Sequence, residues 1–437
     1  MKRMLSVVSV LGAMCVVGVL AQAPAPPAIS TTPGECLKTA RDYRQALMKD
    51  LQTRLREAGK PTTQEDVSAV TAKAGDYARA CAAQFATVDL PAADLPALAE
   101  LQVEAQQLDA AKLTIARALS APGADAAARA ATLNTGVRIL SRQIRQPGVL
   151  DQAEQYVAEL EKLPASFLRE RIDAHGVLNS YYRADDIDAG IITHSTRLIQ
   201  LNAGLAPDER SPQIANTIIA AYQNLAEALA GQEQTPQALD LLRRAPVELP
   251  GIAGVAERLA PTIERYVLVG KPASAIEAPT WLGAPAGTTK LDMPGAVTWL
   301  QFTAHWCGPC REAYPAAVRL QQQFGGKGFG VVMATQLYGY FESSRNLAPA
   351  DELAAIRDYF PKHGIVWPIA VSDNIPPVME NGRPVRKLNV NDANYKVSGI
   401  PQIHIIDRKG VVRLIMIGFD EANEARLTAM IARLLNE

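Results

Sequence analysis

The chain changes character near residue 270, and this change constrains the fold more than any other feature of the sequence. Residues 35–269 are rich in Ala, Leu, Gln, Glu and Arg, which favour helices, and they lack the alternation of Val and Ile that is typical of strands. From residue 270 onwards, short β-branched runs alternate with helical segments. We therefore predict an all-helical domain over residues 35–269, followed by an α/β domain over residues 270–437.

The N-terminus has the features of an export signal. Met1-Lys2-Arg3 is basic, residues 4–20 are almost entirely apolar, and small residues follow at Ala21 and Ala23. This pattern predicts a signal peptide over residues 1–21, because a cut after Ala23 would leave a proline directly behind it. An uncleaved membrane anchor is the alternative, since the apolar run is only slightly shorter than a membrane span.

Residues 22–34 are rich in Pro and Ala, and we predict that they form a tether before the first helix. Export would place the protein in the periplasm or outside the cell, with a membrane-anchored form as the alternative. No other stretch reaches the length of a membrane helix.

The charge balance bears on the kind of partner. The chain has 44 Lys and Arg residues against 45 Asp and Glu residues, which gives a net charge of −1, and 5% of its residues are aromatic. A protein that binds nucleic acid through bulk charge and base stacking would be more basic and more aromatic. We therefore expect no nucleic-acid partner.

The five cysteines divide into groups with different expected roles. Cys15 leaves with the signal peptide, so an even number remains in an oxidising compartment. Cys36 opens a predicted helix over residues 35–58, and Cys81 lies near the end of a second helix that reaches about residue 85. Antiparallel packing would bring the two together, which predicts a structural disulfide, with two buried free thiols as the alternative.

The second of these helices has a predicted capping box, with Thr62 as N-cap and Glu65 at the third position. Further along, residues 178–201 resemble one degenerate helix-turn-helix repeat of the tetratricopeptide type, and residues 225–242 are a weaker second candidate. The helical domain is thus predicted to be repeat-like. It could present a surface to a protein partner, or it could serve as a spacer or dimerisation bundle, and the sequence favours neither reading.

The α/β part contains four clear strand candidates and three helix candidates. The strands are predicted at residues 297–302, 330–334, 403–407 and 411–416, and the helices at residues 311–324, 350–363 and 421–435. The last two strands read as a hairpin, because a short turn around Gly410 separates them.

The motif that carries chemistry follows the first of these strands. Residues 297–302 lead into Cys307-Gly308-Pro309-Cys310, and a helix follows. A C-x-x-C between a strand and a helix is a redox signature, because the helix N-terminus stabilises a thiolate at Cys307 while Cys310 lies one turn further on. A zinc site would need about four ligands, and the sequence offers no second C-x-x-C. A purely structural disulfide would not need Trp306, Gly308 and Pro309 around it. We expect no metal and no cofactor.

At this point the chain resembles the thioredoxin superfamily. Trp306 to Cys310 has the sequence of the thioredoxin active site, Pro315 matches the proline that kinks the active-site helix, and residues 395–401 resemble the cis-proline loop. The insertion that contains residues 363–368 resembles the exported TlpA/ResA subgroup. The likeness covers residues 270–437 and not the helical part.

The resemblance implies roles for individual residues. It makes Cys307 the nucleophile and Cys310 the resolving thiol of a redox-active disulfide. Trp306, Gly308 and Pro309 would form the surface around this pair, and Ile400 and Pro401, joined by a cis peptide bond, would dock the substrate chain.

Two positions near the pair are less clear. Gln301 stands where thioredoxins carry a buried aspartate, so the proton must follow another route, through water or through an acid such as Glu312 or one in the insertion. His305 could tune the thiolate if it were protonated, but we prefer to interpret it as a partly exposed residue.

The remaining histidines are scattered along the chain. We expect His175, His194, His363 and His404 to be surface or hydrogen-bonded core residues.

The predicted function is that of an exported thiol–disulfide oxidoreductase that serves cell redox homeostasis. It would reduce disulfides of periplasmic client proteins and receive electrons from a membrane thiol-reducing donor. One alternative is a thiol peroxidase of the peroxiredoxin class, although that class prefers Thr-x-x-Cys and this chain has Ala304. Another is a helical interaction protein whose redox domain is dedicated to one client.

Overall fold

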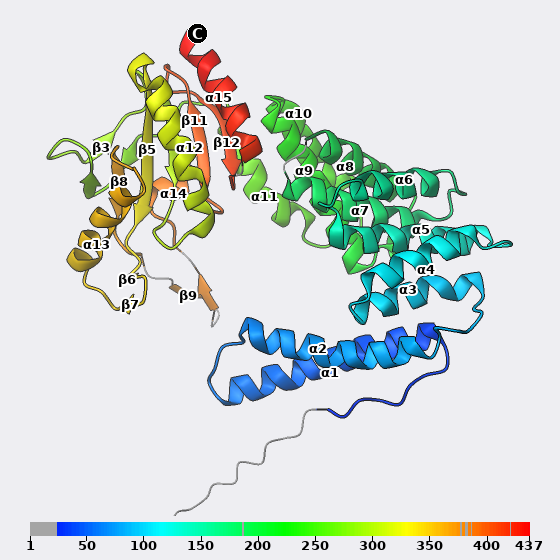
Figure 1. Ribbon diagram of the computed structural model, residues 1–437. Coiled ribbons are helices and arrows are strands. Elements are labelled where there is room, and N and C mark those ends of the chain that lie inside the picture. The colour runs from blue at the N-terminus through cyan, green and yellow to red at the C-terminus, as the bar shows by residue number, and fades with distance from the viewer. Residues whose placement is uncertain (1–23, 186–187, 376–377, 381–382, 386, 420) are drawn as a thin grey trace, which may run out of the picture. The chain divides into compact units, whose positions relative to one another are not determined.

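A computed structural model describes residues 24–185, 188–375, 378–380, 383–385, 387–419 and 421–437 (Figure 1). The predicted signal peptide lies outside the described residues. Within them, no helix combines the length and the apolar character that a membrane crossing requires.

The chain divides into two compact units, of which the first ends at Leu163 and the second spans Pro164–Glu437. The second unit therefore contains both helices and the large sheet. The predicted domain border at residue 270 stays a prediction. It falls inside the second unit, at the point where the last helix before the sheet has ended.

The described residues between 33 and 266 form helices joined by loops and turns, as the sequence predicts. The first unit contains α1 (Pro33–Glu57), α2 (Gln64–Ala83), α3 (Leu95–Glu104), α4 (Leu108–Ser120), α5 (Ala126–Leu140) and α6 (Val149–Glu161). The second unit continues with α7 (Leu168–Ala184), α8 (Asp188–Asn202), α9 (Pro212–Gly231), α10 (Thr235–Glu248) and α11 (Val255–Tyr266). Buried Leu, Ile and Ala side chains fill the space between α8, α9 and α10. That this array is a true repeat stays a prediction.

Helices α1 and α2 form a hairpin, in which Cys36 and Cys81 are joined with their Cα atoms 6.1 Å apart. The predicted capping residues were wrong by one position. Thr63, not Thr62, caps α2: its hydroxyl accepts the amide hydrogen of Asp66, and the Asp66 carboxylate accepts the Thr63 amide hydrogen in return. Aspartate can close this box as well as glutamate can, and the helix therefore starts one residue later.

The segment before α1 lies along this hairpin. The hydroxyl of Tyr43 donates to the carbonyl of Pro24, and the hydroxyl of Tyr77 donates to the carbonyl of Ala28, both at 3.1 Å. Both tyrosines are buried. Part of the predicted tether is thus held by hydrogen bonds to the first two helices.

The second unit contains a six-stranded mixed sheet with the order β12-β11-β4-β5-β8-β2. Its strands are β2 (Thr280–Leu282), β4 (Val297–Phe302), β5 (Phe329–Gln336), β8 (Ile369–Ser372), β11 (Gln402–Ile406) and β12 (Val412–Ile417). The central strands β4, β5 and β8 are parallel, whereas β2, β11 and β12 run antiparallel to their neighbours. The four predicted strands are present, and β2 and β8 are the two that the sequence analysis missed.

Short elements surround the sheet. They are β1 (Ile276–Glu277) with β3 (Lys290–Leu291), β6 (Tyr340–Phe341) with β7 (Ser344–Arg345), β9 (Val378–Glu380) with β10 (Arg383–Val385), and the helices α12 (Gly308–Phe324), α13 (Pro349–Lys362), α14 (Val390–Asn394) and α15 (Glu421–Asn436).

Strand β4 is buried on both faces, which explains its unbroken run of large side chains. Trp299 points into a core shared with α12, α13 and α15, whereas Leu300 points into a second core that includes Tyr395. Successive side chains of β4 thus enter the two cores in turn, so the strand lies at the centre of the domain. Its C-terminal end comes directly before the cysteine motif. The predicted fold class, a helical region followed by an α/β domain, is confirmed.

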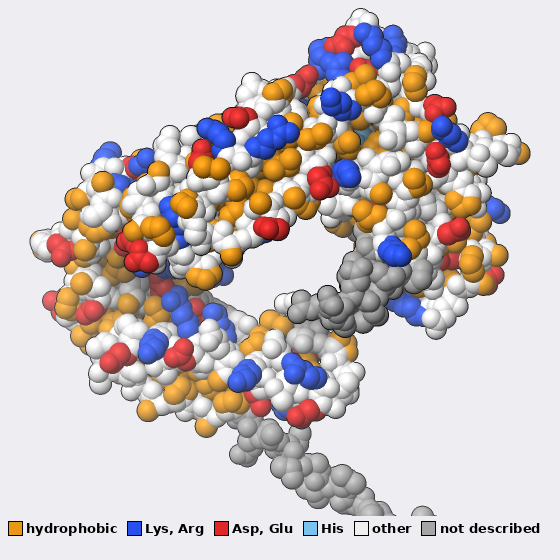
Figure 2. All heavy atoms as spheres, turned by 180° about the vertical axis from the view of Figure 1, so that it is seen from behind, with side chains coloured by type: hydrophobic (Ala, Val, Ile, Leu, Met, Phe, Trp, Pro, Cys, Tyr) orange, Lys and Arg blue, Asp and Glu red, His pale blue; other side chains and the backbone are white. Residues whose placement is uncertain are grey.

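Charged side chains of both signs are intermixed on the face that Figure 2 shows. This agrees with the balanced charge count of the sequence.

Candidate active site

The cysteine pair lies where β4 gives way to α12. Cys307 is the N-cap of α12, and its sulfur accepts the backbone amide hydrogen of Cys310 at 3.2 Å. The two residues form a disulfide with their Cα atoms 5.2 Å apart. Cys307 is 3% exposed and Cys310 is fully buried. When the pair is reduced, a sulfur at this helix terminus is stabilised as a thiolate by the amide hydrogen and the helix dipole.

The loop of residues 395–401, here called the cis-proline loop, lies against the pair. The Ile400–Pro401 peptide bond is cis, as predicted. The carbonyl oxygen of Ile400 lies 3.7 Å from the sulfur of Cys307. The side chain of Gln402 holds the loop from the sheet, because its amide group donates to the carbonyl of Tyr395 and accepts the amide hydrogen of Ser398.

A cleft opens beside this loop and the cysteine motif. Its lining includes Trp306, Gln336, Tyr338, Asn389, Gly399 and Ile400. Trp306 is 47% exposed, and its ring meets the ring of Tyr338 edge to face at 5.4 Å between centroids. Partly exposed aromatic walls next to a buried sulfur suit the docking of an extended peptide, since they offer apolar area while the neighbouring loop offers backbone groups.

Gln301 lies on β4 and is fully buried. Its side-chain oxygen accepts a hydrogen bond from the Trp299 indole at 3.2 Å, and its nitrogen donates to the carbonyl of Cys310 at 3.5 Å. Gln301 thus contacts the backbone of the motif. A side-chain amide at this place can hold its neighbours by hydrogen bonds, but it cannot take up or release a proton at neutral pH.

His305 is buried rather than partly exposed, so the preferred sequence reading was wrong. The side chain is stacked on Phe341 at 4.8 Å between centroids and meets the edges of Tyr338 and Tyr340. The β6–β7 hairpin supplies two of these rings and covers the imidazole, which sequence spacing could not reveal. Burial lowers the pKa of His305 to about 4, against a smaller opposing effect of a hydrogen bond to the Tyr340 backbone. His305 is therefore neutral at pH 7.

Glu352 is an acid of the insertion whose place the sequence did not indicate. It is fully buried at the start of α13, and its two carboxylate oxygens accept the amide hydrogens of Tyr338 and Gly339, each at 2.7 Å. One of these oxygens lies 3.9 Å from Nε2 of His305. Glu312, the acid that the sequence analysis named, is exposed on α12. Glu352 thus fixes the loop that carries the aromatic wall of the cleft.

Other titratable groups near the site do not assemble a metal centre. Among the described residues, no three His, Cys, Asp or Glu side chains are grouped as metal ligands would be. His404 is buried beneath the cis-proline loop, and its Nε2 lies 2.9 Å from the Gln402 amide nitrogen. His175 and His194 form a separate buried pair in α7 and α8, with their Nδ1 atoms 2.8 Å apart.

Comparison with known proteins bears on the domain that contains this site. No family model matches the chain. Thioredoxin-like protein YneN of Bacillus subtilis is 27% identical over 127 residues, which is 29% of this chain. The chain spans about 59% of the length of this curated relative. The likeness agrees with the strand order, the cysteine pair at the start of α12 and the cis-proline beside it. The C-terminal domain is thioredoxin-like.

Solved structures similar to this chain include two from Chlorobium tepidum. One, proposed to be a thiol:disulfide interchange protein DsbE, is 24% identical, with a TM-score of 0.28 and coverage of 38% of this chain and 97% of that one. The other, a thiol:disulfide interchange protein of the thioredoxin family, is 18% identical, with a TM-score of 0.26 and coverage of 38% and 96%. Both cover little more than a third of this chain.

The buried histidines make the stability of the thioredoxin-like domain depend on pH. Burial lowers the pKa of His305 to about 4 and that of His404 to about 3, so the unfolded chain binds more protons than the folded one below about pH 6.5. The stabilisation that comes from keeping these histidines neutral is complete above pH 6.5. It is lost as the pH is lowered towards 4, so the free energy of unfolding decreases. For His305 alone, the expected loss reaches about 3 kcal/mol.

This expectation is tested by urea unfolding of the domain at several pH values. A His305→Phe variant should show a slope between pH 6.5 and 4 that is flatter by up to about 1.4 kcal/mol per pH unit. His363 is exposed, but partial burial and the charge of Arg311 lower its pKa as well, so His363→Phe is a second test position that should flatten the slope in the same direction. Equal slopes in wild type and the His305 variant would contradict the assignment.

Proposed function

We propose that this protein is a thiol–disulfide oxidoreductase that reduces disulfides of exported client proteins. The observation that carries the proposal is the position of Cys307. Its sulfur caps a helix, accepts the Cys310 amide hydrogen and lies 3.7 Å from the Ile400 carbonyl beside a cis-proline. One small region thus combines an activated sulfur, a resolving cysteine and a backbone edge for a substrate chain.

The proposed reaction starts from the reduced pair. The Cys307 thiolate attacks one sulfur of a client disulfide, which forms a mixed disulfide and releases the other client sulfur as a thiolate that takes up a proton. The Cys310 thiol then loses its proton and attacks Cys307. The bond between Cys307 and the client breaks, the second client sulfur is protonated, and the Cys307–Cys310 disulfide remains. The client gains two electrons from the cysteine pair and two protons, one equivalent to that released by Cys310 and one taken from solvent.

Turnover then requires a thiol donor that reduces the Cys307–Cys310 disulfide. We propose a membrane thiol-reducing protein for this role and an exported, periplasmic or secreted site of action. The support is the signal-like sequence of residues 1–21 and the Gly308-Pro309 dipeptide, which resembles that of reducing members of the superfamily. Peroxidase chemistry is not part of the proposal, because Ala304 is apolar and offers no hydroxyl group.

The direction of electron flow is tested by equilibrating the purified protein with glutathione and by assaying the reduction of insulin disulfides. We expect catalysed insulin reduction and a reduction potential nearer to about −270 mV, typical of thioredoxin, than to about −120 mV, typical of a strong oxidant. A potential at the oxidising end would contradict the reductase direction.

The clients are found by trapping. In a Cys310→Ser variant the mixed disulfide with Cys307 cannot be resolved, so client proteins should remain covalently attached and be released by dithiothreitol. The double variant Cys307→Ser/Cys310→Ser is the matched control and should trap none. Equal recovery from both variants would show that the captured proteins do not react with Cys307.

A further inference from the structure

Helix α11 is held against the edge of the thioredoxin-like sheet. Directly after the helix, the amide of Gly270 donates to the carbonyl of Val412 at 2.8 Å, and the amide of Val412 donates to the carbonyl of Lys271 at 3.0 Å. These two bonds attach the chain to β12 as an extra pairing at the sheet edge. The last turn of α11 therefore has a defined position relative to the sheet.

Arg265 in this last turn reaches the cis-proline loop. Its side chain donates to the hydroxyl of Ser398 at 2.6 Å and makes a longer bond to the hydroxyl of Thr262 at 3.4 Å. Arg265 is only 5% exposed, and burial lowers its pKa. A charged donor withdrawn from water binds a neutral oxygen more strongly than a solvated one does, so its hydrogen bond to Ser398 constrains that residue.

The loop is thereby held from two sides. The Gln402 side chain accepts the Ser398 amide hydrogen from the sheet, while Arg265 binds the Ser398 hydroxyl from α11. Two residues further on, the Ile400 carbonyl lies beside the Cys307 sulfur. Only Gly399 separates Ser398 from Ile400, so the position of Ser398 limits where the Ile400 backbone can lie.

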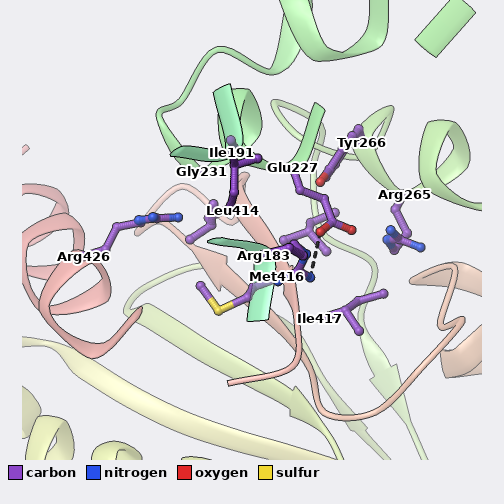
Figure 3. Close-up of a pocket in the computed structure, with 12 residues that line it drawn as sticks. Arg183, Ile191, Glu227, Gly231, Arg265, Tyr266, Leu414, Met416, Ile417 and Arg426 are labelled. Atoms are coloured by element: carbon purple, nitrogen blue, oxygen red, sulfur yellow. Dashed lines mark ion pairs between the residues drawn. The ribbon is translucent and has the colours of Figure 1, made fainter. Parts of the chain in front are cut away.

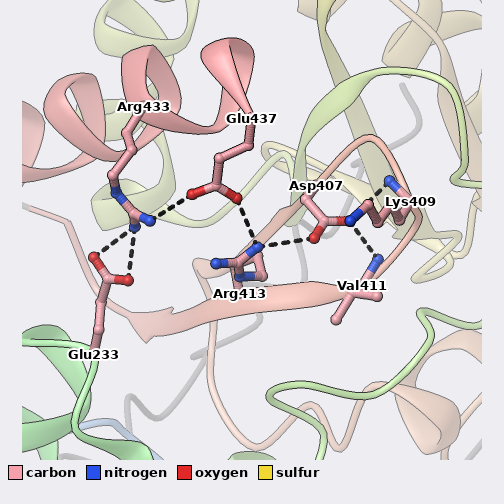
Figure 4. Close-up of polar contacts among 7 residues, drawn as sticks. All are labelled: Glu233, Asp407, Lys409, Val411, Arg413, Arg433 and Glu437. Carbon is pink, nitrogen blue, oxygen red and sulfur yellow. Dashed lines mark hydrogen bonds and ion pairs between the residues drawn. The ribbon is translucent and has the colours of Figure 1, made fainter.

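Other ion pairs join these helices to one another or to α15, and they do not touch this loop. Figure 3 shows the pocket between α8, α9 and β12, where Arg265 lies near the Arg183–Glu227 ion pair. Arg426 of α15 pairs with Asp188 at 2.9 Å. Figure 4 shows a further link, in which Arg433 of α15 binds both carboxylate oxygens of Glu233 at 2.7 Å. One more contact from α11 reaches the loop, the exposed ion pair of Lys396 and Glu264 at 4.0 Å. An exposed pair at this distance contributes little, so the buried Arg265 is the stronger link between α11 and the loop.

We propose that Arg265 is a positioning residue for client docking: through Ser398 it fixes the backbone that the client chain meets beside Cys307. Helix α11 is then part of the docking apparatus rather than a spacer. The kinetic consequence rests on the proposed function. The structural part, that Arg265 orders the cis-proline loop through Ser398, holds independently of any activity.

The structural part is tested by amide hydrogen exchange in the full chain. Two loop amides are hydrogen-bonded, Val397 to the Asp392 carbonyl and Ser398 to the Gln402 side chain. Their exchange should be faster by about tenfold in both Arg265→Ala and Ser398→Ala, as expected for the loss of one charge-assisted hydrogen bond. Ser398 is exposed, so its replacement leaves α11 and the core intact. The control Arg433→Ala removes a link between the same parts and should leave the exchange at these two amides unchanged.

The kinetic part is tested with insulin as substrate. Arg265→Ala and Ser398→Ala should each raise KM by about tenfold with little change in kcat, and the double variant should be no worse than either single one. Arg265→Lys keeps the charge and should recover part of the loss. The reduction potential of the cysteine pair should not change, since neither residue touches the sulfurs.

Different results separate the two proposals. If Arg265→Ala and Arg433→Ala give the same KM and the same exchange at temperatures where both are folded, Arg265 is merely structural and the inference is overturned. If the wild-type protein fails to reduce insulin while the exchange differences are present, the proposed function falls and the positioning of the loop stands.

Discussion

Replacing Cys307 with serine should lower the reduction of insulin disulfides by at least about a thousandfold, because a serine hydroxyl is not ionised at neutral pH and cannot form the mixed disulfide. The expected loss is the largest of any single substitution, since Cys307 is the sulfur at the helix terminus and beside the Ile400 carbonyl. The measurement is the initial rate of insulin precipitation in the presence of dithiothreitol.

The control for this variant is Cys310→Ser, which keeps the attacking sulfur and should still form stable mixed disulfides. Far-ultraviolet circular dichroism should be unchanged in both variants, because the pair spans only 3 residues and contributes little loop entropy. Retained insulin reduction by Cys307→Ser would show that another thiol is the nucleophile.

Removal of the Cys36–Cys81 disulfide should destabilise the helical hairpin by about 4 kcal/mol, the loop-entropy value for a sequence separation of 45 residues. Both cysteines are fully buried, so the double variant Cys36→Ala/Cys81→Ala also loses apolar contacts. The expected result is a lower urea midpoint for unfolding of the first unit, followed by circular dichroism. The chain has two compact units, so the transition should be analysed as more than one step.

The double variant Cys307→Ser/Cys310→Ser provides the comparison, because it removes a disulfide that closes a much shorter loop and should shift the unfolding far less. Activity offers a second check. If the Cys36–Cys81 disulfide is structural, its removal should not change the reduction potential of the Cys307–Cys310 pair. A changed potential would contradict a structural role.

Local patterns account for the parts of the fold that the sequence analysis described well. Strand β4 has the predicted bounds, and α12 follows the cysteine motif directly, because a buried strand and a helix start are encoded by neighbouring residues. Strand β8 is only four residues long and was missed, since its partners are β5 and β2 and its own run carries little signal. The predicted N-cap was Thr62 in place of Thr63, because two adjacent threonines have the same capping ability and the local sequence does not distinguish them.

Local sequence patterns do not predict which residues surround the cysteine pair. The sequence predicts a partly exposed His305, yet the side chain is buried and covered by the hairpin of residues 340–345. Glu352 is distant from the cysteine pair in the sequence, so spacing does not indicate its place. Its role follows from its bonds to the Tyr338 and Gly339 amides. The Arg265–Ser398 bond joins residues 133 positions apart.

Helix propensity, strand burial and the C-x-x-C spacing act over a few residues, so the sequence was sufficient to predict the helical region, the α/β domain and the cysteine pair. Which groups surround that pair depends on tertiary packing. It made His305 neutral, placed the Glu352 carboxylate beneath the cleft wall and brought Arg265 to the cis-proline loop. The physical reason is that burial and hydrogen bonding depend on distant segments packing together, and no short pattern in the chain records that packing.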